Sequence, residues 1–404
     1  MGIIDQSIIV IFLLAIIAFG IWQRKFNTTT DDFFLAGRNL PWWTAMFSIV
    51  ATETSVLTFI SIPGIAYRNN WLFLQLAMGY MLGRILVSFF LLPGYYGKGI
   101  TSIYETIEIR FGPLVQKIAS MIFIITRVLA DGIRFLATAV IVQVITGWSL
   151  TAAVLVIGVV TLIYTWSGGI RTVVLIDSFQ FILYLSGAVI SILYLINYID
   201  NSFLNIFSEL LDSGKLKTID STGNIFFAPW NFISAFIGGT LLSFASHGAD
   251  YMMVQRVLGC KSLHDARKAM IGSGVFVFIQ FTLFLFVGSL LFLFFGGAEL
   301  EKDREFSTFI VQHLPVGLKG ILLAGVLSAA MSTLSSSMNA LASTTVMDWL
   351  KNKASLALSK QVCIFWAAVL ICIALIFDES NTAVVIVGLK IASYTYGGLL
   401  SIFI

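Results

Sequence analysis

Charged residues are scarce in this chain. Only 11% of its 404 residues are charged and 58% are hydrophobic, whereas soluble domains of this size carry about a quarter charged residues. This composition indicates an all-α polytopic protein of the lipid bilayer. The formal net charge of +3 is too small to indicate a nucleic-acid partner.

Cysteine and histidine are equally rare. The three cysteines, Cys260, Cys363 and Cys372, lie far apart, as do the three histidines. Neither set has the spacing of a metal site or an evident disulfide pair. The sequence also lacks a Ser/His/Asp set, paired aspartates and a zinc motif, so we do not expect an enzyme. No filter or pore-lining repeat indicates a channel.

Long apolar runs make up most of the chain. Hydropathy predicts eleven membrane spans, at about 3–23, 42–66, 71–96, 113–146, 150–167, 172–198, 230–250, 268–296, 318–348, 360–377 and 382–404. With the N-terminus outside the cell membrane, 14 Lys and Arg residues, among them Arg256, fall in inner loops and 6 in outer segments. This excess predicts that orientation. Two polar outer loops, 199–229 and 297–317, are expected to form short helices or lids.

Two spans contain polar interruptions. Ile49 to Ile62 reads IVATETSVLTFISI, and SFASHGAD occupies 243–250. Such residues weaken helices, and unwound backbone at bilayer depth is tolerated only inside protein or beside a cavity. The interruptions lie five spans apart, which is typical of an inverted five-helix repeat with broken first helices at a central site. Two merely kinked structural helices are the alternative.

A third span carries a stripe of hydroxyls, in GVLSAAMSTLSSSMNALASTT from Gly325 to Thr345. Steps of three and four place most of these side chains on one helix face. The stripe has two readings. Small residues favour close helix packing, and hydroxyl oxygens with freed carbonyls suit a hard cation.

Five segments together resemble the sodium:solute symporter family. They are DDFFLAGRNLPWW (31–43), GRILVSFFLLPGYY (83–96), YTWSGGIRTVVLIDSFQ (164–180), ADYMMVQRVLGCKSLHDARKA (249–269) and AGVLSAAMSTLSSSMNALASTTVMD (324–348). The resemblance implies a leucine-transporter-like fold in one transmembrane domain, 1–404. One leading helix (about 3–23) precedes two inverted repeats (about 42–198 and 230–404). Because the family usually continues further, we expect a truncated sequence.

The resemblance also implies that sodium is bound at one or two sites. Site one comprises the carbonyls of Ala51, Thr54 and Ala329 and the hydroxyls of Ser332 and Thr333. Site two comprises Asp177 with Ser332, Ser335 and Ser336. From the residues alone, Asp177 is equally well read as a solvated or arginine-paired acid near the interface.

The substrate pocket is expected beside the two interruptions. Its candidate residues are Glu53, Thr58, Gln75, Arg134, Ser243 and His247. Glu53 has two open readings: it binds a cationic group, a proton or the sodium shell, or it is a structural acid that caps freed amides.

Helical spacing places Arg127, Asp131 and Arg134 on one face. One arginine is left in surplus, and we prefer Arg134 as the partner of an anionic solute. His247 is read either as a group that contacts the solute or as a structural histidine.

The function expected from these features is sodium-coupled symport of a small polar or anionic organic solute by alternating access. The alternative is a transporter-like sensor or scaffold that binds solute without net transport.

Overall fold

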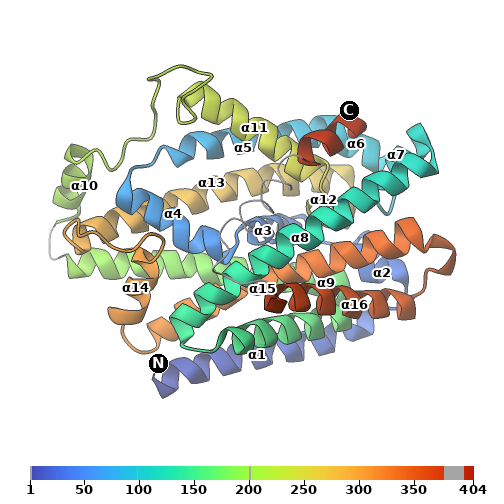
Figure 1. Ribbon diagram of the computed structural model, residues 1–404, viewed down its shortest axis with the longest axis horizontal. Helices are drawn as coiled ribbons and strands as arrows, with labels where there is room; N and C mark the ends of the chain where they lie inside the picture. Colours follow the sequence, from blue (N-terminus) through green and yellow to red (C-terminus); the bar gives the residue numbers. More distant parts are fainter. Residues whose placement is uncertain (1, 98, 200–201, 377–394) are drawn as a thin grey trace.

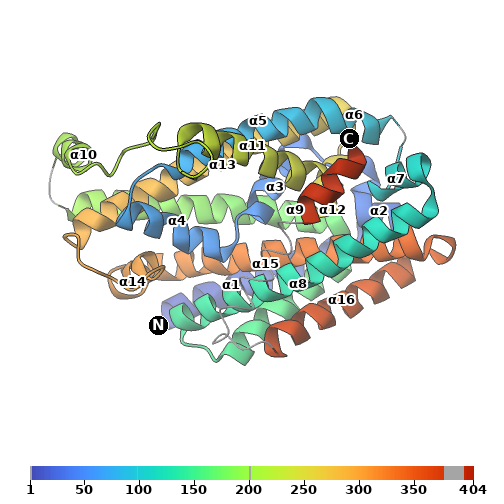
Figure 2. The ribbon, with the colours of Figure 1, turned by 45° about the horizontal axis from the view of Figure 1, so that its top comes forward.

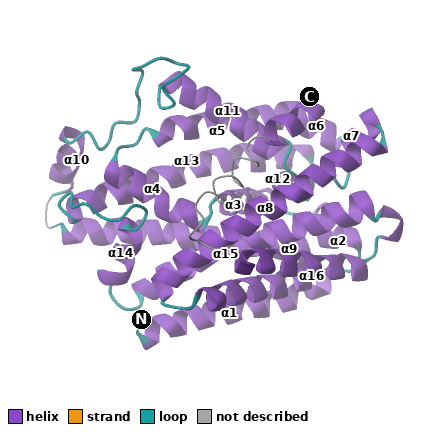
Figure 3. Cartoon of the chain, viewed as in Figure 1, coloured by secondary structure: helices purple, strands orange, loops and turns teal. Residues whose placement is uncertain are grey.

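The computed structural model describes residues 2–97, 99–199, 202–376 and 395–404. Over these residues the protein is helical and contains no named strand (Figures 1 and 3). The helices of the first half are α1 (Ile3–Gln23), α2 (Thr30–Leu35), α3 (Trp42–Glu53), α4 (Val56–Arg68), α5 (Phe73–Leu86), α6 (Leu92–Tyr96), α7 (Tyr104–Phe111), α8 (Pro113–Thr146) and α9 (Leu150–Tyr198).

The second half continues the same architecture. Its helices are α10 (Phe203–Asp212), α11 (Phe232–Gly248), α12 (Tyr251–Leu258), α13 (Leu263–Phe294), α14 (Glu305–Gln312), α15 (Leu318–Thr344) and α16 (Leu356–Ile376). Residues 395–403 are also helical. Two π-helical turns extend longer helices: Val87–Leu91 follows α5, and Thr345–Trp349 follows α15.

The helices account for most of the expected spans. Among the described residues, seven helices are long and apolar enough to cross a membrane, and two further pairs, α3 with α4 and α11 with α12, qualify as broken spans. The 49-residue α9 would measure about 74 Å as one straight helix, far more than a bilayer of about 30 Å. It is interrupted at Gly169 (φ 57°, ψ −161°), so its two arms correspond to the fifth and sixth expected spans.

Gly169 is required at this interruption. A left-handed φ favours glycine, and an added Cβ would lie 2.6 Å from the Phe33 carbonyl oxygen. The eleventh expected span, 382–404, lies largely outside the described residues, so the count of eleven stays a prediction.

The connecting segments gather at the two ends of the long axis. Figure 1 shows α10 and α14 at the end where the chain begins, and α2 and α7 at the opposite end. Both polar loops expected to form short helices do so, at α10 and α14. The described segments of both loops therefore lie at the end of the molecule that carries the N-terminus (Figure 1).

The hydroxyl-rich helix α15 lies at the centre of the molecule (Figure 2). Every residue from Leu322 to Thr344 is buried, and α15 packs against α1, α3, α4, α8, α9, α12, α14 and α16. Complete burial explains why the helix lacks a distinct polar face toward water. Its small residues let neighbouring backbones approach closely.

The two repeats meet closely where α5 packs against α11. A Cβ on Gly79 of α5 would lie 2.2 Å from the Phe236 carbonyl oxygen of α11. A Cβ on Gly239 of α11 would lie 2.3 Å from the Leu76 carbonyl oxygen of α5. Only glycine permits this approach. The contact fixes α11, and with it the second helix break, against the first repeat.

Candidate functional site

The first helix break joins α3 to α4 through Thr54 and Ser55, with a bend of 64°. Thr54 has extended backbone (φ −83°, ψ 98°). Ser55 caps the N-terminus of α4 by accepting a hydrogen bond from the Thr58 amide at 3.4 Å, as serine does at this position. The polar run of the sequence therefore breaks the helix where expected, and frees backbone carbonyls next to α15.

The second helix break joins α11 to α12 through Ala249 and Asp250, with a bend of 63°. Asp250 caps α12 by accepting from the Met252 amide at 3.0 Å. The same carboxylate lies 2.7 Å from Arg127 Nη2 of α8 and accepts a hydrogen bond from the Tyr396 hydroxyl at 2.9 Å. The second break is thus held by a buried ion pair.

One residue expected for sodium site one, Thr333 of α15, contacts the first break. The Thr333 hydroxyl donates to the carbonyl oxygen of Thr52, at 3.4 Å. Ala51, which precedes Thr52, and Ala329, one turn before Thr333 on α15, are both fully buried. The buried Ser332 hydroxyl has no hydrogen-bond partner among the described residues. A cluster of neutral oxygens with one hydroxyl unengaged is suited to a monovalent hard cation.

Two residues that sequence analysis missed support this break. Gln280 of α13 donates from Nε2 to the Thr54 hydroxyl at 2.7 Å. The Tyr184 hydroxyl of α9 donates to Gln280 Oε1 at 3.1 Å. Gln280 is the lone amide side chain of α13 and lies in its long apolar run, and an amide at such a place is a signal for a buried polar contact.

The residues expected for sodium site two also converge, around Asp177 of α9. Asp177 is fully buried, and its Oδ2 atom accepts a hydrogen bond from the Ser48 hydroxyl at 2.6 Å. Ser335 and Ser336 both donate to the Ser332 carbonyl, at 3.0 and 2.7 Å.

A residue outside the expected set completes this cluster. Arg256 of α12 is fully buried, with Nη2 3.4 Å from Asp177 Oδ2, and it also donates to the Ser336 hydroxyl. Its assignment to an inner loop was wrong, because α12 resumes after the break and carries Arg256 into the core. The excess of inner-loop cations persists without it.

Glu53, at the end of α3, is ion-paired within the protein. Its carboxylate accepts from Arg84 of α5, and Arg84 is fully buried and also donates to the Ser273 hydroxyl at 2.8 Å. His247 Nε2 lies 3.7 Å from Glu53 Oε2, while His247 Nδ1 is 2.9 Å from the Ser246 hydroxyl. The charge of Glu53 is therefore balanced without a ligand.

The two arginines on the charged face of α8 differ in how completely their charges are paired. Arg127 lies 3.3 Å from Asp131 and also pairs with Asp250, so it carries no surplus charge. Arg134 lies 3.6 Å from Asp131, with 27% of its side chain exposed. Asp131 also accepts from the Ser337 hydroxyl of α15. Of the two arginines, Arg134 has the weaker internal pairing.

Arg134 shares a small cavity with Thr333, one of the residues expected for sodium site one. The cavity measures about 10 Å³ and lies between α8 and α15. It is lined by Asp131, Arg134, Phe135, Thr138, Ala330, Thr333 and Leu334. The one candidate solute residue with a partly free cation is thus next to a candidate sodium ligand.

Gln75 and Ser243 make internal contacts instead. Gln75 accepts from the Asp220 amide at 3.0 Å and donates to the Trp230 carbonyl at 3.0 Å, which ties the loop before α11 to α5. Hydrogen bonds from the Thr222 hydroxyl and amide in that loop hold the pKa of Asp220 below its usual value. Ser243 donates to the Tyr80 carbonyl at 3.1 Å.

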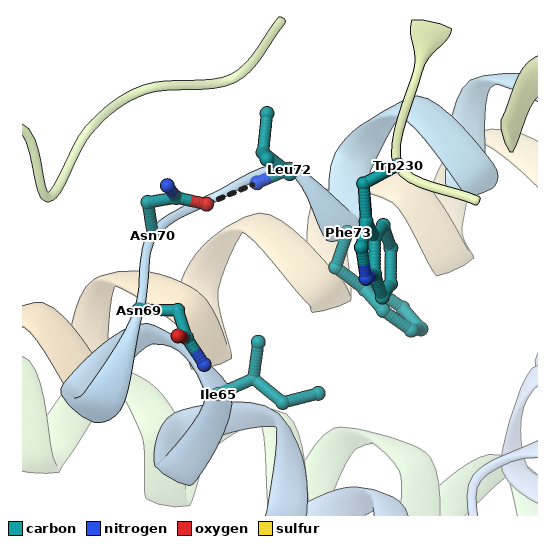
Figure 4. Close-up of a pocket in the computed structure, with 6 residues that line it drawn as sticks. All are labelled: Ile65, Asn69, Asn70, Leu72, Phe73 and Trp230. Carbon is teal, nitrogen blue, oxygen red and sulfur yellow. Dashed lines mark hydrogen bonds between the residues drawn. The ribbon is translucent and has the colours of Figure 1, made fainter. Parts of the chain in front are cut away.

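A wider cavity of about 240 Å³ opens beside this loop, at the end of α4 and the start of α5 (Figure 4). The rings of Phe73 and Trp230 lie side by side there, with centroids 6.4 Å apart. Asn69 and Asn70 face them from the α4–α5 turn, and Asn70 Oδ1 accepts from the Leu72 amide at 3.2 Å. This cavity could not be predicted from local sequence patterns, because its walls come from three separate segments.

Comparison with known proteins assigns a family to this architecture. The chain matches the model of the Sodium:solute symporter family over residues 33–395. It is 26% identical over 364 residues to the sodium/iodide cotransporter of Homo sapiens, which covers 86% of this chain and 56% of that protein. It is 27% identical over 356 residues to the sodium/sialic acid symporter SiaT of Proteus mirabilis, which covers 85% of this chain and 70% of that protein.

A solved structure gives the same answer for the fold. A Na⁺-coupled sialic acid symporter in a substrate-bound outward-open state superimposes with a TM-score of 0.87 at 25% identity. The match covers 100% of this chain and 86% of that chain. It confirms the expected all-α, leucine-transporter-like fold.

Proposed function

Because the chain belongs to the sodium:solute symporter family, we propose that it is a sodium-coupled secondary active symporter and not an enzyme. The contact between Thr333 of α15 and the Thr52 carbonyl at the first break carries this proposal. In this contact a backbone oxygen at a helix break meets a buried hydroxyl inside the bilayer region. Oxygens of these two kinds are the ligands expected of a cation site from which the ion can be released. The chain spans 56% of the length of the human relative, so the activity of the whole protein is part of the proposal.

Sodium site one consists, in this proposal, of the carbonyls of Ala51, Thr54 and Ala329 with the hydroxyls of Ser332 and Thr333. The Thr52 carbonyl joins this set on the strength of its contact with Thr333. A shell without a carboxylate binds sodium weakly enough for release. Site two, with Asp177, Ser332, Ser335 and Ser336, supplies a second ion.

The solute is proposed to be a small anion. Arg134 is the group that recognises it, because its guanidinium is incompletely paired and lies on the cavity that reaches Thr333. A guanidinium fork matches a carboxylate, and the sodium/iodide and sodium/sialic acid relatives are named for anions. Thr58, half-buried at the start of α4, is the second solute residue. Glu53, Gln75, Ser243 and His247 support the pocket through their internal contacts.

The transport cycle is proposed to use the two inverted repeats, about 42–198 and 230–404, behind the leading helix 3–23. Sodium binding stabilises a conformation open to the outside of the cell membrane, where the N-terminus lies. Solute binding closes that side, and rocking of one repeat against the other exposes both ligands inside.

Uptake into proteoliposomes tests the proposal. Purified protein is reconstituted, and uptake of labelled sialic acid, pyruvate and iodide is measured with an inward sodium gradient and with potassium in its place. We expect at least one anion to accumulate only with sodium. Solute binding without accumulation would instead support the sensor or scaffold alternative, and accumulation that is equal in potassium would refute sodium coupling.

A further inference from the structure

Arg256 is a buried cation at the place expected for a second sodium ion. It lies on α12, the eight-residue half of the second broken pair, and its side chain is 0% exposed. Its guanidinium contacts three elements at once: Asp177 on α9, Ser48 on α3 and Ser336 on α15. Such a fork of donors suits a carboxylate with flanking hydroxyls.

The two oxygens of the Asp177 carboxylate differ in their hydrogen-bond partners. Its Oδ2 atom receives Ser48 at 2.6 Å and Arg256 at 3.4 Å. Its Oδ1 atom is buried, as is the hydroxyl of Ser332, and neither makes a hydrogen bond of normal geometry with another described residue, although the Ser332 hydroxyl lies close enough to the Asp177 carboxylate to interact with it. The guanidinium therefore occupies the Oδ2 side of the expected sodium shell, and the Oδ1 side contains buried oxygens that lack a normal hydrogen bond.

This inference rests on the proposed sodium symport. We propose that Arg256 is a tethered counter-cation of Asp177 that competes with sodium at site two and thereby couples that site to the position of α12. A sodium ion bound to Asp177 Oδ1 and Ser332 would share one carboxylate with a second full positive charge inside the protein. Like charges in a buried, weakly screened site oppose each other strongly.

Because Arg256 lies on α12, competition with sodium would change how α12 is held in the core. Arg256 follows the break at Ala249 and Asp250, so α12 is a separate short segment that is bent by 63° from α11. Besides its contacts across the core, Arg256 donates, among the described residues, only to the Met252 carbonyl of its own helix. When sodium displaces the guanidinium, α12 loses these hydrogen bonds to α9, α3 and α15, while Gln255 and Tyr251 still connect it to Asn339 and Ser343 of α15. By reciprocity, anything that moves α12 changes sodium affinity at site two.

Sodium binding to the purified full chain tests the proposal. Equilibrium binding of ²²Na⁺ is measured at constant ionic strength with choline for the unmodified protein, Arg256→Gln, Asp177→Asn and the double variant. We expect Arg256→Gln to raise the sodium affinity of the weaker site at least about tenfold, because a positive charge next to it is removed. Asp177→Asn and the double variant should bind sodium at site one alone.

The outcomes separate this inference from the proposed function. If the unmodified protein binds no ²²Na⁺, the proposed symport fails. If it binds sodium and Arg256→Gln gives the same curve, the competition is refuted. Loss of sodium binding in Arg256→Gln would also refute it, because Arg256 would then support the ion.

A second measurement needs no variant and applies if Arg256→Gln does not fold. Hydrogen exchange of the unmodified protein is followed over residues 251–258 with and without sodium. Displacement of Arg256 predicts faster exchange in α12 when sodium saturates both sites. Unchanged or slower exchange would overturn the proposal.

Discussion

The two broken helix pairs have nearly the same bend, 64° and 63°, but different chemistry. At the first break the contacts of Thr52 and Thr54 are neutral, because the Thr52 carbonyl accepts from the Thr333 hydroxyl and Gln280 donates to Thr54, while the charge of Glu53 between them is paired with Arg84. At the second break Asp250 is held by the Arg127 guanidinium. Two helix breaks of the same bend therefore have different roles. Neutral oxygens leave room for an added cation, whereas a charge pair provides its own cation and fixes the turn.

The largest loss of stability is expected when Arg127, the cation at the second break, is removed. Arg127→Gln leaves Asp250, which is 1% exposed, without its ionic partner, and removal of one member of a buried pair costs about 3–5 kcal/mol. We expect a large fall in thermal midpoint in detergent. The control Arg134→Gln removes a cation from the same helix face whose side chain is 27% exposed, and it should cost less than about 1 kcal/mol. Equal losses in the two variants would contradict the assigned pairing.

A substitution that changes no charge should also affect thermal stability and sodium binding at the first break. Gln280→Leu deprives the Tyr184 hydroxyl of its partner, and an unsatisfied buried group costs about 1–3 kcal/mol. The Thr54 hydroxyl also loses a contact but still donates to the Val50 carbonyl at 2.8 Å. We expect lower thermal stability together with weaker stabilisation by sodium. Ser289→Ala is the control, because Ser289 lies on the same helix and accepts from Trp71 at 2.9 Å, away from the break. If both variants retain the full sodium response, Gln280 does not support the ion site.

A smaller effect is expected next to the first break, where Thr52 also reaches Asp177 at 3.5 Å. Asp177→Asn keeps the shape of the side chain and removes its charge. We expect the Hill coefficient for sodium to fall toward one while some transport persists. The measurement is initial uptake rate against sodium concentration in proteoliposomes. A Hill coefficient equal to that of the unmodified protein would remove Asp177 from the sodium sites.

Both breaks could be predicted from the sequence because their signals are local. Polar and β-branched residues within an apolar run reveal an interruption without any knowledge of the neighbours. The hydroxyl stripe of α15 and its burial were likewise readable, because hydroxyls at bilayer depth need protein partners.

The partners of the buried charges could not be predicted in the same way. Glu53 was a candidate ligand, and the sequence contained no indication that Arg84 balances it. Arg256 looked like an inner-loop cation, because it follows a break and precedes the polar run at 259–268. Its contact with Asp177 spans 79 residues of chain. Such ion pairs depend on how distant helices pack against each other. The local residue pattern contains no information about that packing.

The neutral oxygens at the first break allow sodium binding by this chain to be tested directly. Equilibrium binding of ²²Na⁺ is compared for the unmodified protein, Thr333→Ala and Ser328→Ala. Ser328 belongs to the same stripe, but its hydroxyl donates to the Ala324 carbonyl of its own helix at 2.7 Å. We expect Thr333→Ala to weaken sodium binding about tenfold or more, which corresponds to the loss of roughly one hydrogen bond to a charged group. Ser328→Ala should leave sodium binding unchanged. Unaltered sodium affinity in Thr333→Ala would contradict the assignment of the first break as the ion site.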